Sequence, residues 1–406
     1  MANQRPGRHG GRFFSICGDN PQSSKKSERF NNSWFKLLLE RITDKLLSET
    51  GREGVLGIYL CGSFATGEGT VIVRGDEALF ISDLDLVMLV DSLDLHARIL
   101  RDRKRLGVIC QGLSEEAVFT EGISVGVYHL SELPELVPSP LTLDMKQKAV
   151  TLFGDRDLPD RIRAEEVTEY EGIRLLENRA CSLMGSIHLS GSSDPASRIE
   201  LAYSISRVYT DILTAILIFR KRYLPGYRAR LKELRAVREE EKDILSEEIF
   251  SRIAEWTEYK LCPSERDPGE DIWKKWELAG RDLIDHWRIF RSKRPGKEVQ
   301  SRGVEEILGE YRSRYTLWQR LKRWAGYLGR FSPFRRLWKI LYLNRSILRL
   351  APSELVTYTG IRVLNHITEG SKKSSVLSYG RGFARMRAEA TKDAASLHEL
   401  WTEVNK

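Results

Sequence analysis

Two carboxylates separated by a single residue occur inside an apolar run of the sequence. Asp83 and Asp85 flank Leu84 in ISDLDLVMLV, residues 81–90. Residues i and i+2 of a β-strand point to the same face, so both carboxylates would project together while the leucines pack behind them. Neighbouring carboxylates repel each other unless a cation lies between them, and Mg²⁺ binds such oxygens together with substrate phosphates. The pair therefore predicts a divalent-metal site at Asp83 and Asp85.

A Gly-Ser turn upstream supplies candidate phosphate-binding groups. The run VLGIYLC, residues 55–61, reads as a buried strand and leads directly into Gly62-Ser63. Gly62 has no side chain and lets the backbone approach a phosphate closely, and the Ser63 hydroxyl can donate a hydrogen bond. A helix that opens at Phe64 would add the attraction of its N-terminus. Gly62 and Ser63 are therefore candidate phosphate-binding residues.

Helical and strand-like patterns alternate around these residues. Apolar residues at three- and four-residue spacing predict helices, and short apolar or alternating runs predict strands. The expected elements are a helix at 33–47, a strand at 55–61, a hairpin at 70–73 and 78–81, a strand at 84–90, a helix at 95–107 and a strand at 123–130. Prolines 134, 138 and 140 break the pattern that follows. The order predicts an α/β (α+β) head with a mixed sheet.

The remainder of the chain has a helical period. The expected helical stretches are 172–189, 198–219, 228–257, 270–292, 303–345 and 379–404. A chain of 406 residues suggests two or three domains at about 150 residues each. We expect a flexible tail at 1–30, the head at 31–160, a large α-helical bundle at 161–300 and a basic, aromatic helical region at 301–406.

The Gly62-Ser63 turn, the strand with Asp83 and Asp85 and the later strand resemble the DNA polymerase β-like nucleotidyltransferase superfamily. LFGDRD, residues 152–157, also resembles the close of the minimal members of that superfamily. The helical part is similar to the regions that follow such heads in aminoglycoside-type nucleotidyltransferases. The resemblance covers about residues 33–157 and implies a nucleotidyltransferase domain at 31–160.

The resemblance also implies an activity. Asp83 and Asp85 would be the catalytic, metal-binding residues, with Mg²⁺ or Mn²⁺ as the ion and an NTP as substrate. Gly62, Ser63 and Ser82, the residue before Asp83, would bind the nucleotide. ATP is assumed because it is the most frequent choice. The enzyme would move a nucleoside monophosphate onto an acceptor hydroxyl. A small molecule such as a sugar is favoured over a protein or RNA end, because no recognised RNA-binding module accompanies the head.

One position departs from the family pattern. The strand ISVGVY places Ser124, or less directly Gly126, where the family carries a third acid that helps to hold the metal and deprotonates the attacking hydroxyl. Glu121, just before the strand, reads more simply as a loop residue. The helical body could supply the base, with Asp211 and Glu177 as first candidates, or the nucleophile could need little activation. Alternatively, the protein binds nucleotide without turnover. We favour retained activity.

Positive charge is concentrated in one C-terminal segment. The net charge is +8, yet eleven Lys and Arg residues and no acid lie between Glu310 and Glu354. Aromatic residues interleave with these cations over 312–349. Such a pattern suits an anionic membrane surface or nucleic acid. An amphipathic helix pair that completes the helical body is the simpler interpretation.

Other features narrow the class of protein. There is no stretch of 18 consecutive apolar residues and no apolar run of signal-peptide length, so we expect a cytoplasmic protein, with a peripheral membrane location as an option. The five cysteines are scattered without a CxxC pair, which indicates neither a disulfide framework nor a zinc site. Arg281 and His286 match the spacing of HEPN ribonucleases, but i, i+5 is a poor same-face spacing on a helix.

Overall fold

The computed structural model describes residues 32–74, 77–117, 122–192, 194–241, 245–263, 268–269, 271–292, 303–310, 313, 315–328 and 350–373. The chain divides into two compact units, each considered by itself. The head unit comprises Met1–Glu171, Arg220–Arg235 and Thr257–Glu265, and the helical unit comprises Gly172–Phe219, Ala236–Trp256 and Arg266–Lys406. The segments Arg220–Arg235 and Thr257–Glu265 therefore belong to the head unit although they follow parts of the helical unit in the sequence.

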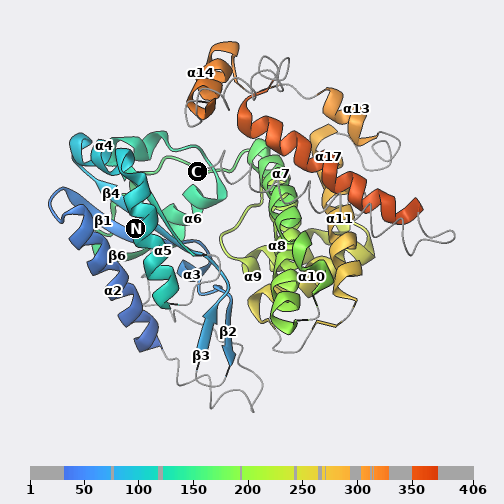
Figure 1. The fold of residues 1–406 in the computed structure, drawn as a ribbon, viewed down its shortest axis with the longest axis horizontal. Coiled ribbons are helices and arrows are strands. Elements are labelled where there is room, and N and C mark those ends of the chain that lie inside the picture. Colours follow the sequence, from blue (N-terminus) through green and yellow to red (C-terminus); the bar gives the residue numbers. More distant parts are fainter. Residues whose placement is uncertain are drawn as a thin grey trace, which may run out of the picture. The chain divides into compact units, whose positions relative to one another are not determined.

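A four-stranded mixed sheet forms the centre of the head unit (Figure 1). Its order is β5-β4-β1-β6, with β1 at Val55–Cys61, β4 at Leu84–Val90, β5 at Ile123–His129 and β6 at Val150–Gly154. β1 runs antiparallel to β4 and β6, whereas β4 and β5 are parallel. The predicted strands at 55–61 and 84–90 are confirmed, and the predicted mixed sheet is present.

Three helices cover one face of this sheet (Figure 1). They are α2 (Asn32–Thr50), α4 (Leu93–Arg101) and α5 (Arg103–Ala117). Their apolar side chains form one core with alternate strand residues such as Leu60, Leu86 and Met88. The helix predicted at 95–107 is instead two helices, because Asp102 has φ −100° and ψ 35° and interrupts the helical geometry.

The remaining elements of the head unit are short helices, a hairpin and 3₁₀ turns. β1 leads into the single-turn helix α3 (Gly62–Ala65), and a separate hairpin follows from β2 (Val71–Arg74) and β3 (Glu77–Phe80). α6 (Pro140–Lys148) contacts both β1 and α3. The prolines were read as breaks, but Pro140 begins α6, because Ser139 caps the helix by accepting from the amide of Thr142. Short 3₁₀ turns, η2 (Leu130–Glu135) and η3 (Leu158–Arg161), complete the head.

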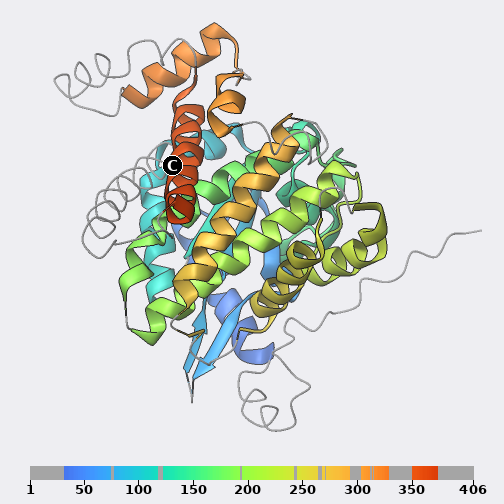
Figure 2. The same cartoon turned by 90° about the vertical axis from the view of Figure 1, so that its right-hand side faces the viewer.

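The helical unit is built around α8 and α11, which pack against each other (Figure 2). α11 and α14 also contact α17. The helices are α7 (Glu169–Gly185), α8 (Pro195–Phe219), α9 (Tyr227–Val237), α10 (Glu247–Leu261), α11 (Ile272–Ser292), α13 (Val304–Gly309), α14 (Leu317–Leu328) and α17 (Pro352–Lys373), with 3₁₀ turns η4 (Ile187–Gly191) and η5 (Arg238–Glu241). α7, α9 and α10 each begin or end in the head unit. The helical stretch predicted at 379–404 lies outside the described residues.

Two further observations concern apolar length and cysteine. Within the described part of the chain, α8 is the one helix long and apolar enough to cross a membrane, and 89% of its apolar window is buried inside the protein. Cys61, Cys110 and Cys181 are buried free thiols.

Candidate functional site

The two carboxylates lie at the beginning of β4. Asp83 directly precedes the strand and Asp85 is its second residue. Both are half-buried, whereas Ser82, Leu84 and Leu86 are buried. This alternation places the two acids on one face of the strand and the leucines on the other. Leu86 belongs to the core under α2, α4 and α5, so the acids occupy the opposite, less covered face.

Gly62 lies in contact with Asp85 at the same edge of the sheet. The register pairs Cys61 with Asp85 across β1 and β4, and Gly62 is the next residue. Gly62 has φ +65°, and a Cβ atom at this position would lie 2.5 Å from Oδ2 of Asp85. Any side chain would therefore collide with the carboxylate, in a backbone conformation that L-residues disfavour. We call this contact the Gly62–Asp85 corner.

Ser63 is half-buried in α3, directly beside this corner. Its carbonyl oxygen accepts a hydrogen bond from the amide of Glu68 at 2.7 Å. α3 has only four residues, so its dipole is small and adds little to anion binding. Ser63 can act on a ligand through its own hydroxyl and through the adjacent backbone.

Ser124 occupies the position beside Asp85 on the neighbouring strand. The parallel register pairs Asp85 with Ser124 and Val87 with Gly126. The Ser124 hydroxyl donates to Oδ1 of Asp85 at 2.8 Å. Asp85 therefore has one oxygen engaged by Ser124 and the other at Gly62. Glu121 lies outside the described residues.

The donor set can be compared with the needs of a metal ion. In the described ranges, no group of three or more His, Cys, Asp and Glu side chains is arranged to hold one. A pair of carboxylates on one face suits Mg²⁺, which keeps several waters and takes further ligands from substrate phosphates. Asp83 and Asp85 therefore fit an ion that arrives with a nucleotide better than a permanently bound metal.

A buried lysine lies next to the acidic strand. Lys260, in the last turn of α10, is 3% exposed. Its Nζ donates to Oγ1 of Thr70 at 3.3 Å and to Oγ of Ser82 at 3.4 Å, and it lies over the ring of Tyr227. Lys260 follows Ser82 by 178 residues, and no local pattern marked it in the sequence.

The same contacts define the role of Ser82. Its side chain is fully buried, and its Oγ accepts from the amide of Thr70 at 2.9 Å as well as from Lys260. Ser82 was expected to bind nucleotide directly. In this structure its hydroxyl is enclosed by these partners and contacts Lys260 instead of facing a ligand.

A further carboxylate, Asp144, lies on α6 and is 9% exposed. Its Oδ1 accepts from the Tyr223 hydroxyl at 2.7 Å, and its Oδ2 is 3.8 Å from the Arg230 guanidinium. Burial raises the pKa of Asp144 above its usual value, against the opposing effect of Arg230. Burial, followed by Asp85 and Asp144, also raises the pKa of the Cys61 thiol.

Glu68 holds the returning segment 220–235 in place. Its carboxylate is 6% exposed and accepts from the backbone amides of Tyr227 and Arg228, in the first turn of α9. A negative charge is favourable at a helix N-terminus. Together with the Asp144 contacts to Tyr223 and Arg230, this fixes the segment to the head unit.

The Ser139-Pro140 helix start was the sequence signal that could have placed Asp144 on a helix.

The acids proposed as a supplied base are engaged elsewhere. Asp211 and Glu177 both lie in the helical unit. Asp211 accepts from Nε of Arg179 at 2.5 Å, and Glu177 accepts from the indole of Trp287 at 3.2 Å. Both acids therefore belong to the unit that does not contain Asp83 and Asp85.

The Arg281 and His286 pair does not form an accessible site. His286 is 2% exposed, and its Nδ1 contacts the carbonyl of Asp282 at 2.7 Å. The Nε2 atom of His286 is buried without a hydrogen-bond partner, while Nε of Arg281 donates to the carbonyl of Glu277. A buried imidazole cannot contact RNA, which argues against the ribonuclease interpretation.

The head unit thus combines two acids on one face of β4, a glycine in contact with one of them and a buried lysine that contacts the residue before the other. No protein-family model, no curated protein and no solved structure matches this chain.

Proposed function

We propose that the protein is a Mg²⁺-dependent nucleotidyltransferase that moves a nucleoside monophosphate from an NTP to an acceptor hydroxyl. The observation that supports this most directly is the Gly62–Asp85 corner. There, a carboxylate able to bind the ion lies in direct contact with the backbone of the Gly62-Ser63 turn. A small-molecule acceptor such as a sugar remains the favoured class.

Each residue of the site has a role in this proposal. Asp83 and Asp85 would hold the ion, which when bound offsets the charge that builds up on the phosphate oxygens. Gly62 and Ser63 would bind the triphosphate through backbone approach and a hydroxyl donor. Lys260, held by Thr70 and Ser82, would anchor the end of α10 to the residue that precedes Asp83.

The base that accepts the proton of the attacking hydroxyl is assigned to Asp144 in this proposal. A hydroxyl such as that of Ser124 is a poor base at neutral pH, whereas a carboxyl group with a raised pKa is closer to the optimum for proton transfer. Asp144 lies on α6, which contacts β1 and α3, the elements that meet at the Gly62–Asp85 corner, and burial raises the pKa of Asp144. Asp144→Asn should therefore slow transfer while nucleotide binding persists.

A second candidate function has its own supporting observation. Ser124 donates to Asp85 from the position where the family carries its third acid. A hydroxyl there lowers the negative charge available to hold a catalytic ion. The protein would then bind Mg²⁺-nucleotide without turnover and act as a nucleotide-responsive binding protein.

Nucleotide titration in the presence and absence of Mg²⁺, with pyrophosphate release followed in parallel, tests both candidates. ATP and the other NTPs are combined with acceptors that include sugars, protein and RNA ends. Mg²⁺-dependent binding with pyrophosphate release supports the enzyme, and binding without release across the acceptors supports the second candidate.

Variants of the acidic pair provide the control. Asp83→Asn/Asp85→Asn should abolish Mg²⁺-dependent nucleotide binding and leave thermal stability equal or slightly higher, because carboxylate repulsion is relieved. Asp91→Asn, an exposed acid directly after β4, is the matched control and should bind as the unaltered protein does. Nucleotide affinity that survives in the double variant refutes the site.

A further inference from the structure

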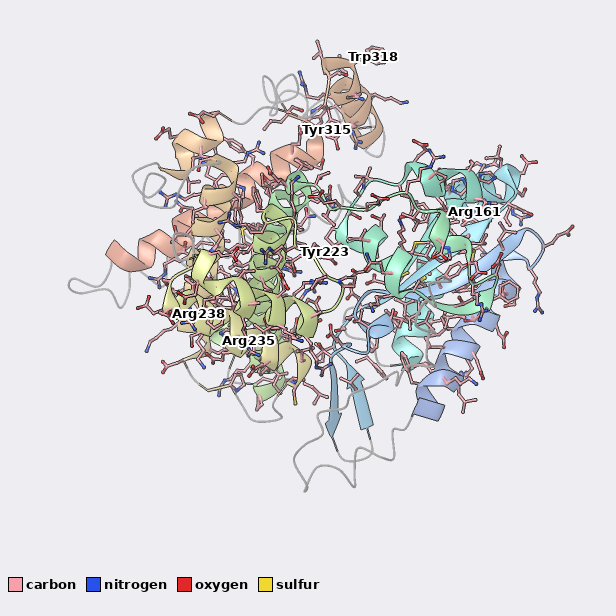
Figure 3. All side chains as sticks on the ribbon, turned by 180° about the vertical axis from the view of Figure 1, so that it is seen from behind. Arg161, Tyr223, Arg235, Arg238, Tyr315 and Trp318 are labelled. Carbon is pink, nitrogen blue, oxygen red and sulfur yellow. The ribbon has the colours of Figure 1, made fainter. Side chains whose placement is uncertain are left out.

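α14 of the helical unit presents one tryptophan to solvent and buries another. Trp318 is 76% exposed and Leu317 is 50% exposed. Trp324 is 3% exposed, and its indole donates to the carbonyl of Leu350 at 2.8 Å. Figure 3 shows Trp318 projecting from the outer side of α14. The helix is therefore anchored through Trp324 and leaves large apolar side chains uncovered at its first turn.

Helical geometry separates these two tryptophans. Residues six apart on an α-helix lie about 120° from each other around the axis, whereas residues four apart share a face. Trp318 therefore shares its face with Lys322, which is exposed, and Ala325 continues that face as an exposed small residue. The outer face of α14 combines an aromatic ring and a cation.

The sequence on both sides of α14 is rich in positive charge. Arg323, also exposed, lies over the ring of Tyr315 at 4.1 Å. Between Glu310 and Glu354 the sequence has eleven Lys and Arg residues and no acid. Glu354 itself is 4% exposed and accepts from the Ser313 hydroxyl at 2.6 Å and from the Ala351 amide at 2.8 Å. The carboxylate that ends the basic stretch is therefore turned inward.

We propose that the outer face of α14 docks on an anionic lipid bilayer surface. The Trp318 indole would enter the interface, together with the exposed Leu317 side chain at the first turn, and Lys322 would contact the negatively charged headgroups. Tryptophan is favoured at the boundary between headgroups and acyl chains. Exposed apolar residues next to cations are the pattern of helices that lie in this plane.

The neighbouring leucine favours lipid over nucleic acid. Single-stranded nucleic acids bind through cations and through stacking on aromatic rings. An exposed aliphatic side chain gains nothing from base stacking, but it gains from transfer into an apolar medium. Leu317 and Trp318 together therefore match a bilayer surface better than an RNA strand. Docking at a membrane does not depend on the nucleotidyltransferase proposal.

Cosedimentation of the full chain with lipid vesicles tests the proposal. One vesicle contains phosphatidylcholine alone, and the other contains phosphatidylcholine and phosphatidylserine at about three to one. We expect binding to the anionic vesicle only, weakening as salt rises because the charge attraction is screened. Trp318→Ala should weaken binding about tenfold or more, and Lys322→Gln about fivefold, the value of one cation at such a surface.

Leu93→Ala is the matched control. Leu93 is 66% exposed but lies on α4 of the head unit, so its replacement should leave vesicle binding unchanged. Trp318→Ala should unfold at the same temperature as the unaltered protein, since the side chain is mostly solvated. Nucleotide binding, measured in the same variants, should also be unchanged and reports on the head separately.

Three results would overturn the proposal. Equal binding to both vesicles would remove the role of charge, and full binding by Trp318→Ala would remove the role of α14. A single-stranded RNA oligonucleotide that binds the chain and loses affinity with Trp318→Ala, while neither vesicle binds, would assign this face to nucleic acid.

Discussion

Replacing Ser124 by aspartate would place a third carboxylate beside Asp85. The two positions are in register on adjacent parallel strands, and their side-chain oxygens are already 2.8 Å apart. Ser124→Asp removes a hydrogen bond and sets two negative charges on one face of the sheet. Ser124→Asn is the control, because asparagine has nearly the same shape and carries no charge.

The size of the effect follows from these contacts. Loss of the Ser124 hydrogen bond costs about 1 kcal/mol. Two carboxylates at about 5 Å repel by about 3 kcal/mol at an effective dielectric constant of about 20, and by less where water screens them. Ser124 is exposed, so the repulsion falls between about 1 and 3 kcal/mol. Without divalent ions, Ser124→Asp should be less stable than Ser124→Asn by that amount.

Urea unfolding with EDTA and with Mg²⁺ measures this difference. Mg²⁺ should raise the free energy of unfolding of Ser124→Asp more than that of Ser124→Asn, because a shared cation offsets the repulsion. The difference between the two variants should also vanish below about pH 4, where carboxylates are protonated. If the missing acid limits turnover, Ser124→Asp should release pyrophosphate faster than the unaltered protein.

A contrary result would be clear. Equal stability of the two variants in EDTA, together with an equal response to Mg²⁺, would mean that position 124 and Asp85 do not share an ion-binding face. The assignment of the metal site to this edge of the sheet would then be wrong.

Three further predictions concern stability, and urea unfolding measures each. Gly62→Ala should lower the free energy of unfolding by about 1–2 kcal/mol, because alanine is strained at positive φ. It should also weaken nucleotide binding, because the new methyl group displaces Asp85. Gly107→Ala is the control: a Cβ atom there meets open space, so neither stability nor nucleotide binding should decrease. Asp282→Asn should cost about 3 kcal/mol, because the Arg252 guanidinium that donates to both carboxylate oxygens loses its buried counter-charge; a cost below about 1 kcal/mol would contradict this. Because burial raises the pKa of Asp144, the protonated carboxyl group contributes to stability below about pH 4, and this contribution is lost as the pH rises and the group ionises. The free energy of unfolding of Asp144→Asn, relative to that of the unaltered protein, should therefore increase from about pH 4 to pH 8. A difference that does not change with pH would contradict a raised pKa at Asp144.

The strands that carry the acids were predictable because their patterns are local. An apolar run with acids at i and i+2 can be buried as a strand only if both acids share one face, and β4 has the predicted bounds. Helix boundaries were harder to predict from the sequence. Asp102 divides the region predicted as one helix, and Pro140 starts a helix where it was read as a break, because proline fits the first turn as well as a loop.

By itself, the sequence determined the acidic pair, the Gly-Ser turn and the strands that lead to them, since each depends on residue types a few positions apart. Only the tertiary structure decided what surrounds the pair. The parallel register of β5 placed the Ser124 hydroxyl next to Asp85. The segments 220–235 and 257–265, which belong to the head unit, placed Lys260 beside Ser82 and Arg230 beside Asp144. Buried charges require partners, but which remote segment supplies them is set by the packing of whole elements and leaves no local pattern.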